Sequence, residues 1–404
     1  MEEQVGNTPL DTAPLLDIDP YAVDVLLNPH PFFEQLRETA AVVQLKPYGV
    51  YAVGRHDEAV RVLTDHEFFT TTGGVGLFDI RKPGIHRPAN PILERDPPDH
   101  TVIRRTITQI ISPLVIRSWR ERFENEARLI VDDVLARGSI DGVENIAEAF
   151  VMNAFASVLG VDMPRDATLA ISEMSFNRAG PFNELRAASE IRAEPYIEWY
   201  SHHVKRDAMK PGSVGMQLYE AEDKGLLPTG TAEATCRLLI RAGTDTTIAG
   251  IGFTLNQLAQ HPDQFELVKQ DLNRVKDAFE EAIRHESPSY TNFRTTTQAV
   301  ELSGFALEAD TKIAVFLGAA GRDPRKWPDA DRYDVLRRPA GTHLAFGVGT
   351  HVCIGQMIAR LESECILKAL LARIDSLQLD GEPTFRAINQ LRTLDRLPLR
   401  LKAA

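Results

Sequence analysis

The feature that most constrains this chain is a cysteine in a glycine-rich turn directly before a long helical pattern. Residues 346–355 follow the pattern F-x-x-G-x-H-x-C-x-G, with Cys353 as the cysteine, and a helical pattern covers residues 356–374. Unpaired N–H groups and the positive end of the dipole at a helix start favour a thiolate there. The glycines let the backbone turn sharply and pass close to a flat group, and the ring of Phe346 can cover such a group.

This turn has two interpretations. One is a structural cysteine buried among glycines. The other is a ligand of haem iron, because a shielded thiolate pushes electron density toward O–O cleavage when it holds a haem that activates oxygen. All five fixed positions of the pattern are present and three further stretches agree, so the sequence predicts that Cys353 binds haem iron. Phe346 and Gly355 are then candidate contacts of the haem.

Composition argues against several other classes of protein. The chain of 404 residues carries 45 basic and 57 acidic residues, a formal net charge of −12, which disfavours nucleic acid as a partner. The cysteines Cys236, Cys353 and Cys365 form no C-x-x-C pair, which argues against zinc and disulfide frameworks and fits a reducing cytoplasm. No run of 18 apolar residues is present, so we expect no membrane span.

The pattern along the chain indicates one domain after a loose start. Residues 1–20 are polar and contain proline, without the basic and apolar regions of a signal peptide, and we expect a loose segment there. No linker divides residues 21–404, for which we predict a single domain. We predict a mainly α fold with small β-sheets, because helical patterns dominate from residue 100 onward without βαβ alternation.

The individual elements follow from apolar periodicity and from turn residues. Helices are predicted at residues 31–40, 57–64, 101–111, 113–137, 147–159, 166–176, 183–207, 231–260, 262–268 and 273–286. Short strands are expected within residues 42–53 and 290–308, at 311–317, and near the C-terminus. Residues 70–98 form a long irregular stretch rich in glycine and proline. Such a loop in a compact domain is usually functional.

The predicted helix at residues 231–260 has a polar interruption at its centre. Gly243 weakens a helix, and the hydroxyls of Thr244, Thr246 and Thr247 can bond back to carbonyls and bend it. One interpretation is a kink that faces solvent. The other is a local opening for water and O2, with Asp245 and Thr246 delivering the two protons that oxygen cleavage needs in a dry site. Beside the cysteine pattern we favour the second interpretation.

Charged residues elsewhere add two weaker patterns. Glu281 and Arg284 form E-x-x-R on a predicted helix, close to an apolar face, where a buried ion pair would lock the core around the cysteine turn. A haem carries two propionates, and buried carboxylates need charged or hydrogen-bonding partners. Each candidate partner taken singly also fits an ordinary surface group. The candidates are His100, Arg104, Arg294 and His351.

Taken together, the four patterns resemble a bacterial cytochrome P450 across essentially the whole chain. The resemblance implies a triangular, mostly helical prism around a buried haem b. Cys353 would be the axial ligand, Asp245 and Thr246 the acid and alcohol that handle protons, and Glu281 with Arg284 the structural pair. The reaction implied is R–H + O2 + two electrons + two protons giving R–OH and water.

A narrower resemblance is to bacterial members that demethylate para-methoxybenzoates, carried by residues 71–77, 180–186 and 293–297. Those enzymes hold the substrate carboxylate with a loop arginine, a helix arginine and serines, and Arg87 and Arg237 match the arginines. The serine positions are Asn90 and Leu238 here. The chain also differs at two pocket positions, Ala179 and Asn292, and at Arg241, where a small residue is usual. The substrate-binding candidates are Arg87, Asn90, Arg237, Arg241, Ala242 and Asn292.

Arg241 lies one turn before Asp245 on a helix that should be largely buried. An unpaired buried guanidinium is very costly. An ion pair with Asp245 or with another acid would solve this within the chain. Contact with an anionic or polar substrate is the other solution. The sequence leaves both open.

The expected substrate is a small or medium aromatic acid or polar phenolic, which is hydroxylated or O-demethylated. A neutral terpenoid-like or natural-product substrate is the alternative, and a non-catalytic haem-thiolate sensor or carrier is an alternative of another class. The chain has no flavin or Fe–S motif, so we expect electrons from NAD(P)H through a separate reductase and ferredoxin. Ferredoxins are usually acidic, so a basic patch with Arg104, Arg105 and Arg360 should surround Cys353. We expect a cytoplasmic monomer.

Overall fold

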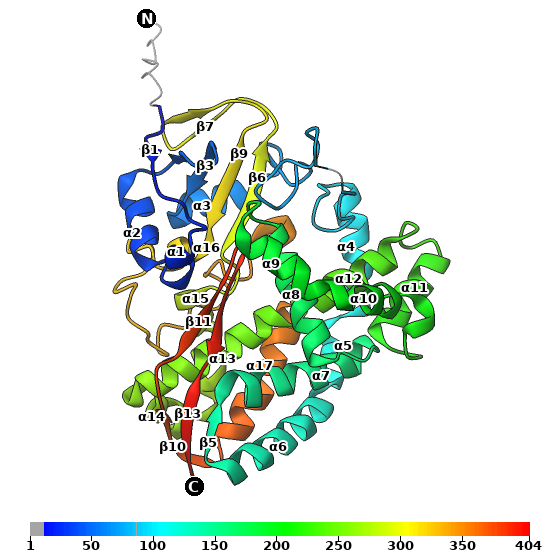
Figure 1. Cartoon of the computed structure of the whole chain (residues 1–404), viewed down its shortest axis with the longest axis vertical. Helices are drawn as coiled ribbons and strands as arrows, with labels where there is room; N and C mark the ends of the chain where they lie inside the picture. The colour runs from blue at the N-terminus through cyan, green and yellow to red at the C-terminus, as the bar shows by residue number, and fades with distance from the viewer. Residues whose placement is uncertain (1–11, 86) are drawn as a thin grey trace, which may run out of the picture.

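The computed structural model describes residues 12–85 and 87–404 (Figure 1). The α-helices are α1 Val23–Leu27, α2 His30–Thr39, α3 His56–Thr64, α4 Asp99–Ile110, α5 Pro113–Ser118, α6 Arg120–Arg137, α7 Ala149–Leu159, α8 Arg165–Arg178, α9 Glu184–Ala193, α10 Ile197–His203, α11 Val214–Asp223, α12 Thr231–Gly243, α13 Asp245–Gln260, α14 Pro262–Gln270, α15 Val275–Glu286, α16 Leu317–Gly321 and α17 Gln356–Leu371. A π-helix, η1, covers Gly142–Glu148, and the 3-10 turns are η2 Glu194–Tyr196, η3 Arg206–Ala208, η4 Leu272–Arg274 and η5 Gly349–His351.

The strands are short and fall into four sheets. They are β1 Leu15–Leu16, β2 Val43–Leu45, β3 Val50–Val53, β4 Phe69–Thr70, β5 Ser139–Asp141, β6 Thr291–Thr296, β7 Val300–Leu302, β8 Phe305–Leu307, β9 Lys312–Phe316, β10 Ile374–Leu379, β11 Thr384–Ile388, β12 Leu391–Arg396 and β13 Pro398–Ala403. The largest sheet has the order β1-β2-β3-β9-β6-β4, and β10-β13-β5, β11-β12 and β7-β8 form the others. The predicted mainly α fold with small sheets is confirmed.

The sheet of six strands and most of the long helices occupy different parts of the molecule (Figure 1). Strand β9 lies inside this sheet, parallel to β3 and antiparallel to β6, and all five of its residues are buried. Helices α2 and α16 lie against this part, whereas α6, α7, α13 and α17 pack together in the other part. The second part holds the largest apolar core, which includes Phe150, Phe253 and Leu367.

The central helix breaks where the sequence predicts it to break. Helix α12 ends at Gly243 and α13 begins at Asp245, with Thr244 between them at φ −84° and ψ −72°. Two other predicted helices are wrong in length. Residues 113–137 form α5 and α6, which separate at Trp119, where the indole packs beside Phe123. Residues 183–207 break at η2, because Pro195 cannot donate a helical hydrogen bond.

Two further expectations need correction. Helix α11 was missing from the prediction, although Ser213 caps it by accepting a hydrogen bond of 3.2 Å from Met216 N. Of the loose segment predicted at residues 1–20, residues 1–11 lie outside the described residues. Residues 12–20 are held in place, because β1 pairs with β2 and Leu16 is buried. No helix in the described part of the chain has the length and apolarity needed to cross a membrane.

The long stretch between β4 and α4 contains neither helix nor strand in its described residues, as predicted. Polar contacts fasten it to its surroundings. Lys312 Nζ of β9 donates to the carbonyls of Gly73 at 2.8 Å and Gly74 at 2.6 Å. Leu77 N donates to Ala179 O at 2.8 Å, which joins the stretch to the turn after α8. We call residues 71–98 the distal loop.

Candidate active site

The cysteine turn takes the shape that its glycines require. Gly347 and Gly349 have φ of +68° and +75°, a conformation that residues with a side chain rarely adopt. Cys353 N donates to Phe346 O at 2.7 Å, which closes the turn just before α17 begins. The guanidinium of Arg360 lies 4.6 Å from the centre of the Phe346 ring and holds that ring in place. We call residues 343–355 the cysteine loop.

The environment of Cys353 suits a thiolate bound to a metal better than a free thiol. Burial raises the pKa of the Cys353 thiol, and the N–H groups of Gly355 and Gln356 together with Arg104 and Arg360 partly offset this. Cys353 as a whole residue is only half-buried. A metal ion would deprotonate a thiol in this position. A bound iron would therefore add to the stabilisation of the thiolate that these N–H groups and arginines provide.

The four predicted propionate contacts come together beside the cysteine loop. The rings of His100 and His351 are 4.3 Å apart, centre to centre. Arg104 donates to Val352 O at 2.7 Å, next to Cys353. Arg294 and His351 line one cavity. Sequence positions more than 190 residues apart therefore meet at one side of the same loop, as the spacing between His100 and Arg294 illustrates.

These donors have few acceptors of their own. Both ring nitrogens of His100 are buried without a hydrogen-bond partner in the described residues. Burial lowers the pKa of His100 to about 4 and that of Arg294 to about 10. Among the described residues, Arg294 donates only to the carbonyl of Phe293, at 2.9 Å. Buried donors left without acceptors are costly, so the cluster fits a group that carries carboxylates.

One carboxylate of the chain already lies in this cluster. Asp96 Oδ1 is 3.9 Å from His351 Nε2 and accepts from Thr71 Oγ1 at 2.9 Å, and Thr70 Oγ1 also donates to Asp96. Burial works to raise the pKa of Asp96, but His351 and the threonine donors bring it well below its usual value. Asp96 offsets only part of the positive charge, and the donor set fits the two propionates of a haem.

The break between α12 and α13 is built from hydroxyl contacts to carbonyls one turn back. Thr244 Oγ1 donates to Ile240 O at 2.8 Å, Thr246 Oγ1 to Ala242 O at 2.7 Å, and Thr247 Oγ1 to Gly243 O at 3.0 Å. Ala242 and Thr246 are half-buried, whereas most of α13 is fully buried. The side chains of these two residues therefore border open space inside the molecule.

Asp245 is buried without a partner. Its side chain is 1% exposed, and neither carboxylate oxygen has a hydrogen-bond partner among the described residues. Burial raises the pKa of Asp245 to about 7, against the opposing effects of Arg386 and of the Ser172 hydroxyl nearby, which donates its hydrogen bond to Arg241 O at 2.7 Å. A carboxyl group with this pKa gains and loses a proton near neutral pH, which is the property that general acid catalysis requires.

The predicted pair Glu281 and Arg284 is fully buried. Arg284 Nε lies 2.7 Å from Glu281 Oε2, and Arg284 also donates to Gly321 O and Ala330 O at 2.6 and 2.9 Å. The pair therefore fastens α15 to α16 and to the irregular chain after it. Arg337 adds a second ion pair to Glu281 at 3.0 Å.

The residue that fastens α15 to the cysteine loop is Glu280, which the sequence analysis missed. Glu280 Oε2 lies 2.7 Å from His343 Nε2 in the cysteine loop and 3.1 Å from an Arg360 nitrogen on α17. Only the adjacency of Glu280 to the E-x-x-R pattern could have pointed to it. The pairing of His343 with Glu280 depends on how α15 and the loop pack.

Two of the three candidate substrate arginines are already paired within the chain. Arg87 forms two hydrogen bonds to Glu94, one of them of 2.7 Å. Glu94, also missed from sequence, accepts from Asn90 N at 2.7 Å and is 1% exposed. Arg237 pairs with Glu233 at 2.8 Å, one turn away on α12. Arg87 and Arg237 therefore have their own carboxylates.

The remaining substrate candidates form no ion pair with these acids. Asn90 Oδ1 accepts from Ile92 N and Leu93 N, so its side chain shapes the distal loop. Asn292 lines the cavity that Arg294 and His351 also line. Arg241 forms no ion pair with Asp245 or with any other described acid, which excludes the internal solution considered from sequence.

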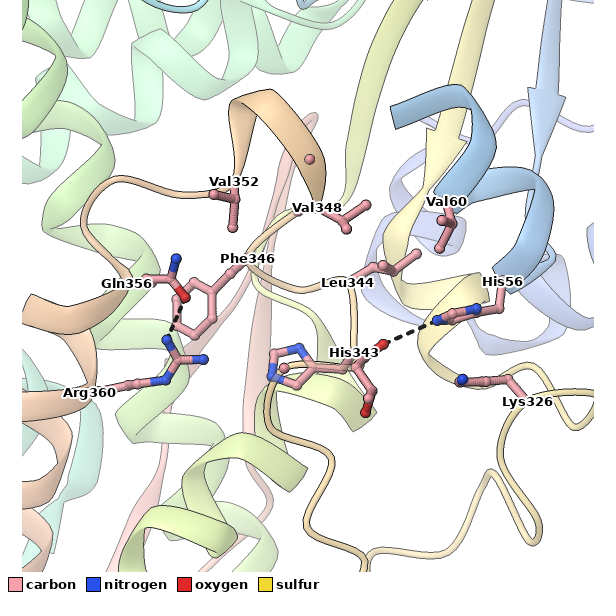
Figure 2. A pocket seen from close by; sticks show the side chains of 14 residues that line it. His56, Val60, Lys326, His343, Leu344, Phe346, Val348, Val352, Gln356 and Arg360 are labelled. Carbon is pink, nitrogen blue, oxygen red and sulfur yellow. Dashed lines mark hydrogen bonds between the residues drawn. The ribbon is translucent and has the colours of Figure 1, made fainter. Parts of the chain in front are cut away.

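A second cavity, of about 360 Å³, lies on the outer side of the cysteine loop between α3 and α17 (Figure 2). Every ionisable side chain that lines it is basic: His56, Lys326, His343 and Arg360. Of the predicted patch, Arg360 is paired with Glu280 and Arg104 is half-buried, whereas Arg105 is exposed. The side chains that line this cavity beside the cysteine loop are thus basic where they are ionisable. Arg360 is paired with Glu280, whereas Lys326 has no acid partner among the described residues.

Comparison with known proteins gives one consistent result. The family description "Cytochrome P450" matches residues 203–389. The chain is 39% identical to Cytochrome p450 CYP199A2 of Rhodopseudomonas palustris, over 97% of this chain and 95% of the relative. It is 29% identical to 6-deoxyerythronolide B hydroxylase of Saccharopolyspora erythraea, over 97% and 100%. The structure of cytochrome P450 CYP109Q5 from Chondromyces apiculatus superposes with a TM-score of 0.81 at 31% identity, covering 96% of this chain and 99% of that one.

Proposed function

The chain belongs to the cytochrome P450 family and is a monooxygenase, and from this premise we propose that it oxidises a small or medium aromatic compound with a polar or anionic end. Hydroxylation or O-demethylation is the expected outcome. The observation that carries the proposal is the arginine Arg241, which lies deep in the molecule beside Ala242 and has no acid partner in the described residues. A neutral substrate would leave this charge without compensation.

We assign the cofactor as haem b. Cys353 would hold its iron, Phe346 and Gly355 would contact it, and its propionates would meet His100, Arg104, Arg294 and His351. When bound, the haem supplies the site at which O2 is activated. The contribution of the chain is to shield the thiolate, to supply donors to the propionates and to keep the ring in one orientation.

Asp245 and Thr246 act on protons and water. With a pKa of about 7, the Asp245 carboxyl can give up a proton and regain it at neutral pH. The Thr246 hydroxyl, hydrogen-bonded to Ala242 O, is placed to hold a water or a developing hydroxyl at the helix break. Oxygen cleavage consumes two protons, and a pair of this kind suits their delivery in a site without bulk water.

Electrons come, in this proposal, from NAD(P)H through a separate reductase and ferredoxin. The basic cavity beside the cysteine loop, with Lys326, and the exposed Arg105 on α4 support docking of an acidic protein there. Lys326→Gln and Arg105→Gln should each raise the ferredoxin concentration needed for half-maximal rate a few-fold at low salt. The exposed Arg206 lies outside this surface, and Arg206→Gln serves as the control. Activity independent of ionic strength would exclude electrostatic docking.

A product assay tests the substrate proposal. The enzyme, with a ferredoxin, its reductase and NADH, is incubated with 4-methoxybenzoate, 4-methoxyphenol and a monoterpene. Formaldehyde and the demethylated product should form with the first two. Product from the terpene alone would favour a neutral substrate. Ligand binding without consumption of NADH or O2 would favour a sensor or carrier. Cytoplasmic location and a monomeric state stay predictions.

A further inference from the structure

Arg241 differs from Arg87 and Arg237 in having no partner among the described residues. Its guanidinium forms no hydrogen bond or ion pair with the described residues. Arg241 lies deep in the molecule, yet its side chain is only half-buried. A side chain far from the outer surface that still has exposed area borders an internal space. That space is reached from α12 next to Ala242, which is half-buried as well.

The groups whose charges act on the pKa of Arg241 come from three elements. Tyr200 lies on α10, Glu94 and Arg87 belong to the distal loop, and Arg237 lies one turn earlier on α12. Tyr200 donates its hydroxyl to Arg237 O at 2.9 Å and is therefore not a donor to a ligand. Glu94 is saturated by Arg87 and by the N–H groups of Asn90 and Val75. Glu94, the carboxylate whose charge raises the pKa of Arg241, is thus committed to other donors.

The two arginines near Arg241 increase its need for an anion. Burial lowers the pKa of Arg241, and the positive charges of Arg87 and Arg237 add to this effect. Arg87 and Arg237 are each compensated by a carboxylate, Glu94 and Glu233. The local excess of positive charge therefore resides on Arg241, which faces the internal space.

We propose that Arg241 determines the charge specificity of the enzyme by binding the carboxylate of its substrate, in place of Arg87 and Arg237. The proposal rests on the proposed function and deepens it. The Cα of Arg241 precedes that of Thr246 by five residues, about 7.5 Å along a helix. Helical side chains lean toward the N-terminus, so the guanidinium lies farther still from Thr246. This separation suits a molecule whose carboxylate and oxidised carbon lie at opposite ends of one aromatic ring.

The experiment measures binding by calorimetry to the haem-loaded protein, independently of turnover. The probes are 4-methoxybenzoate, benzoate and phenylacetate, each with its methyl ester. Arg241→Gln removes the charge, Arg241→Lys keeps it, and Arg87→Gln and Arg237→Gln are matched controls. A charge-assisted hydrogen bond lost from a dry site should weaken acid binding about tenfold or more.

The expected result is a selective effect on the acids. Arg241→Gln should raise the Kd of each acid about tenfold and leave that of each ester within about twofold. Arg241→Lys should recover part of the loss, and Arg87→Gln and Arg237→Gln should change acid binding less than Arg241→Gln does. Absence of any preference for acid over ester in the wild type would overturn the proposal. So would a larger acid-selective loss in Arg87→Gln or Arg237→Gln.

Failure of this proposal is distinguishable from failure of the proposed function. If polar aromatic compounds are oxidised but Arg241→Gln affects acid and ester equally, only the role of Arg241 is wrong. If acids bind through Arg241 but no oxidised product forms with ferredoxin and NADH, the assigned reaction is wrong and the binding site stands. Far-ultraviolet circular dichroism and the unfolding midpoint of each variant identify any loss of folding, and Arg241→Lys then provides the comparison.

Discussion

The cysteine loop and the distal region, made of the distal loop with the break between α12 and α13, differ in how they treat buried charge, because the distal region has unpaired groups beside the pair of Arg87 and Glu94. Around the cysteine loop, Glu280 meets His343 and Arg360, and Arg284 meets Glu281. In the distal region, Asp245 and Arg241 have no partners in the described residues. Satisfied groups hold a scaffold in one geometry, whereas unsatisfied groups are available to protons and ligands.

The two regions also differ in how the backbone is held. The cysteine loop has glycines at positive φ and continues directly into α17, a helix of 16 residues. The distal loop lacks helices and strands in its described residues and is held by polar contacts of side chains such as Lys312 and Glu94. Segments with few buried apolar contacts open at lower free energy. We therefore expect the distal side to admit the substrate and the cysteine side to stay rigid.

The largest effect should follow from Cys353→Ser. A serine oxygen cannot replace thiolate donation, so activity should be lost and the reduced carbon monoxide complex should no longer absorb near the wavelength that gives the family its name. Cys236→Ser and Cys365→Ser are the controls, because both cysteines are buried away from the loop. A Cys353→Ser protein with the original absorption band and full activity would show that Cys353 does not bind the haem iron, and the cysteine loop would then not be the haem-binding side of the molecule.

The next effect concerns the paired charges of the cysteine side. Arg284→Gln leaves the buried Glu281 carboxylate with Arg337 and the N–H of Asp334 as its described partners. Breaking a buried ion pair from one side costs about 3–5 kcal/mol, and urea unfolding of the haem-loaded protein measures this loss. The exposed pair of Arg206 and Asp223 supplies the control, and Arg206→Gln should leave the unfolding midpoint nearly unchanged. Equal effects of both substitutions would contradict the scaffold role.

Asp245→Asn tests the role of an unpaired group in the distal region. Removing an acid from a proton path acts on a chemical step, so turnover should fall about 100-fold while substrate Kd stays within about twofold. Unchanged turnover would show that protons arrive by another route. The measurement is the rate of product formation at saturating substrate and ferredoxin.

The effect of Asp245→Asn on the free energy of unfolding should also depend on pH. The pKa of Asp245 is raised from 3.8 to about 7 on folding, so the folded state binds this proton more tightly than the unfolded state. The contribution of this group to stability therefore falls as pH rises from about 4 to 7. Asp245→Asn should gain stability over the wild type by roughly 1–3 kcal/mol more at pH 8 than at pH 5. If the difference in unfolding free energy between wild type and Asp245→Asn, measured with urea, did not change with pH, the Asp245 carboxyl would not be an unpaired buried group.

The smallest effect is expected on the coupling of NADH consumption to product formation, and Thr246→Ala tests it. Thr246→Ala should bind substrate and consume NADH at near the original rate, but a larger share of the electrons should appear as hydrogen peroxide. Thr247→Ala is the matched control, since its hydroxyl makes the same contact one turn back but its side chain is 3% exposed. Equal peroxide yields from the two variants would show that the Thr246 hydroxyl has no specific role in coupling NADH consumption to product formation.

Much of the fold could be predicted because its signals are local. The helix break at Thr244, the hairpin of β2 and β3 and the irregular distal loop all follow from nearby glycines, hydroxyls and apolar spacing. Errors arose where packing or a proline divides a pattern, as at Trp119 and Pro195. The roles of the predicted site residues and the single domain for residues 21–404 stay predictions.

The sequence by itself determined the cysteine turn and the order of its elements, because a positive φ at glycine and a helix start depend only on neighbouring residues. Only the tertiary structure decided which charges are paired. Arg87 and Arg241 are the same residue type, but Glu94 forms an ion pair with Arg87 and none with Arg241. Pairing between distant side chains depends on how the distal loop packs over α12. That packing leaves Arg241 without a carboxylate and makes it the candidate for a ligand.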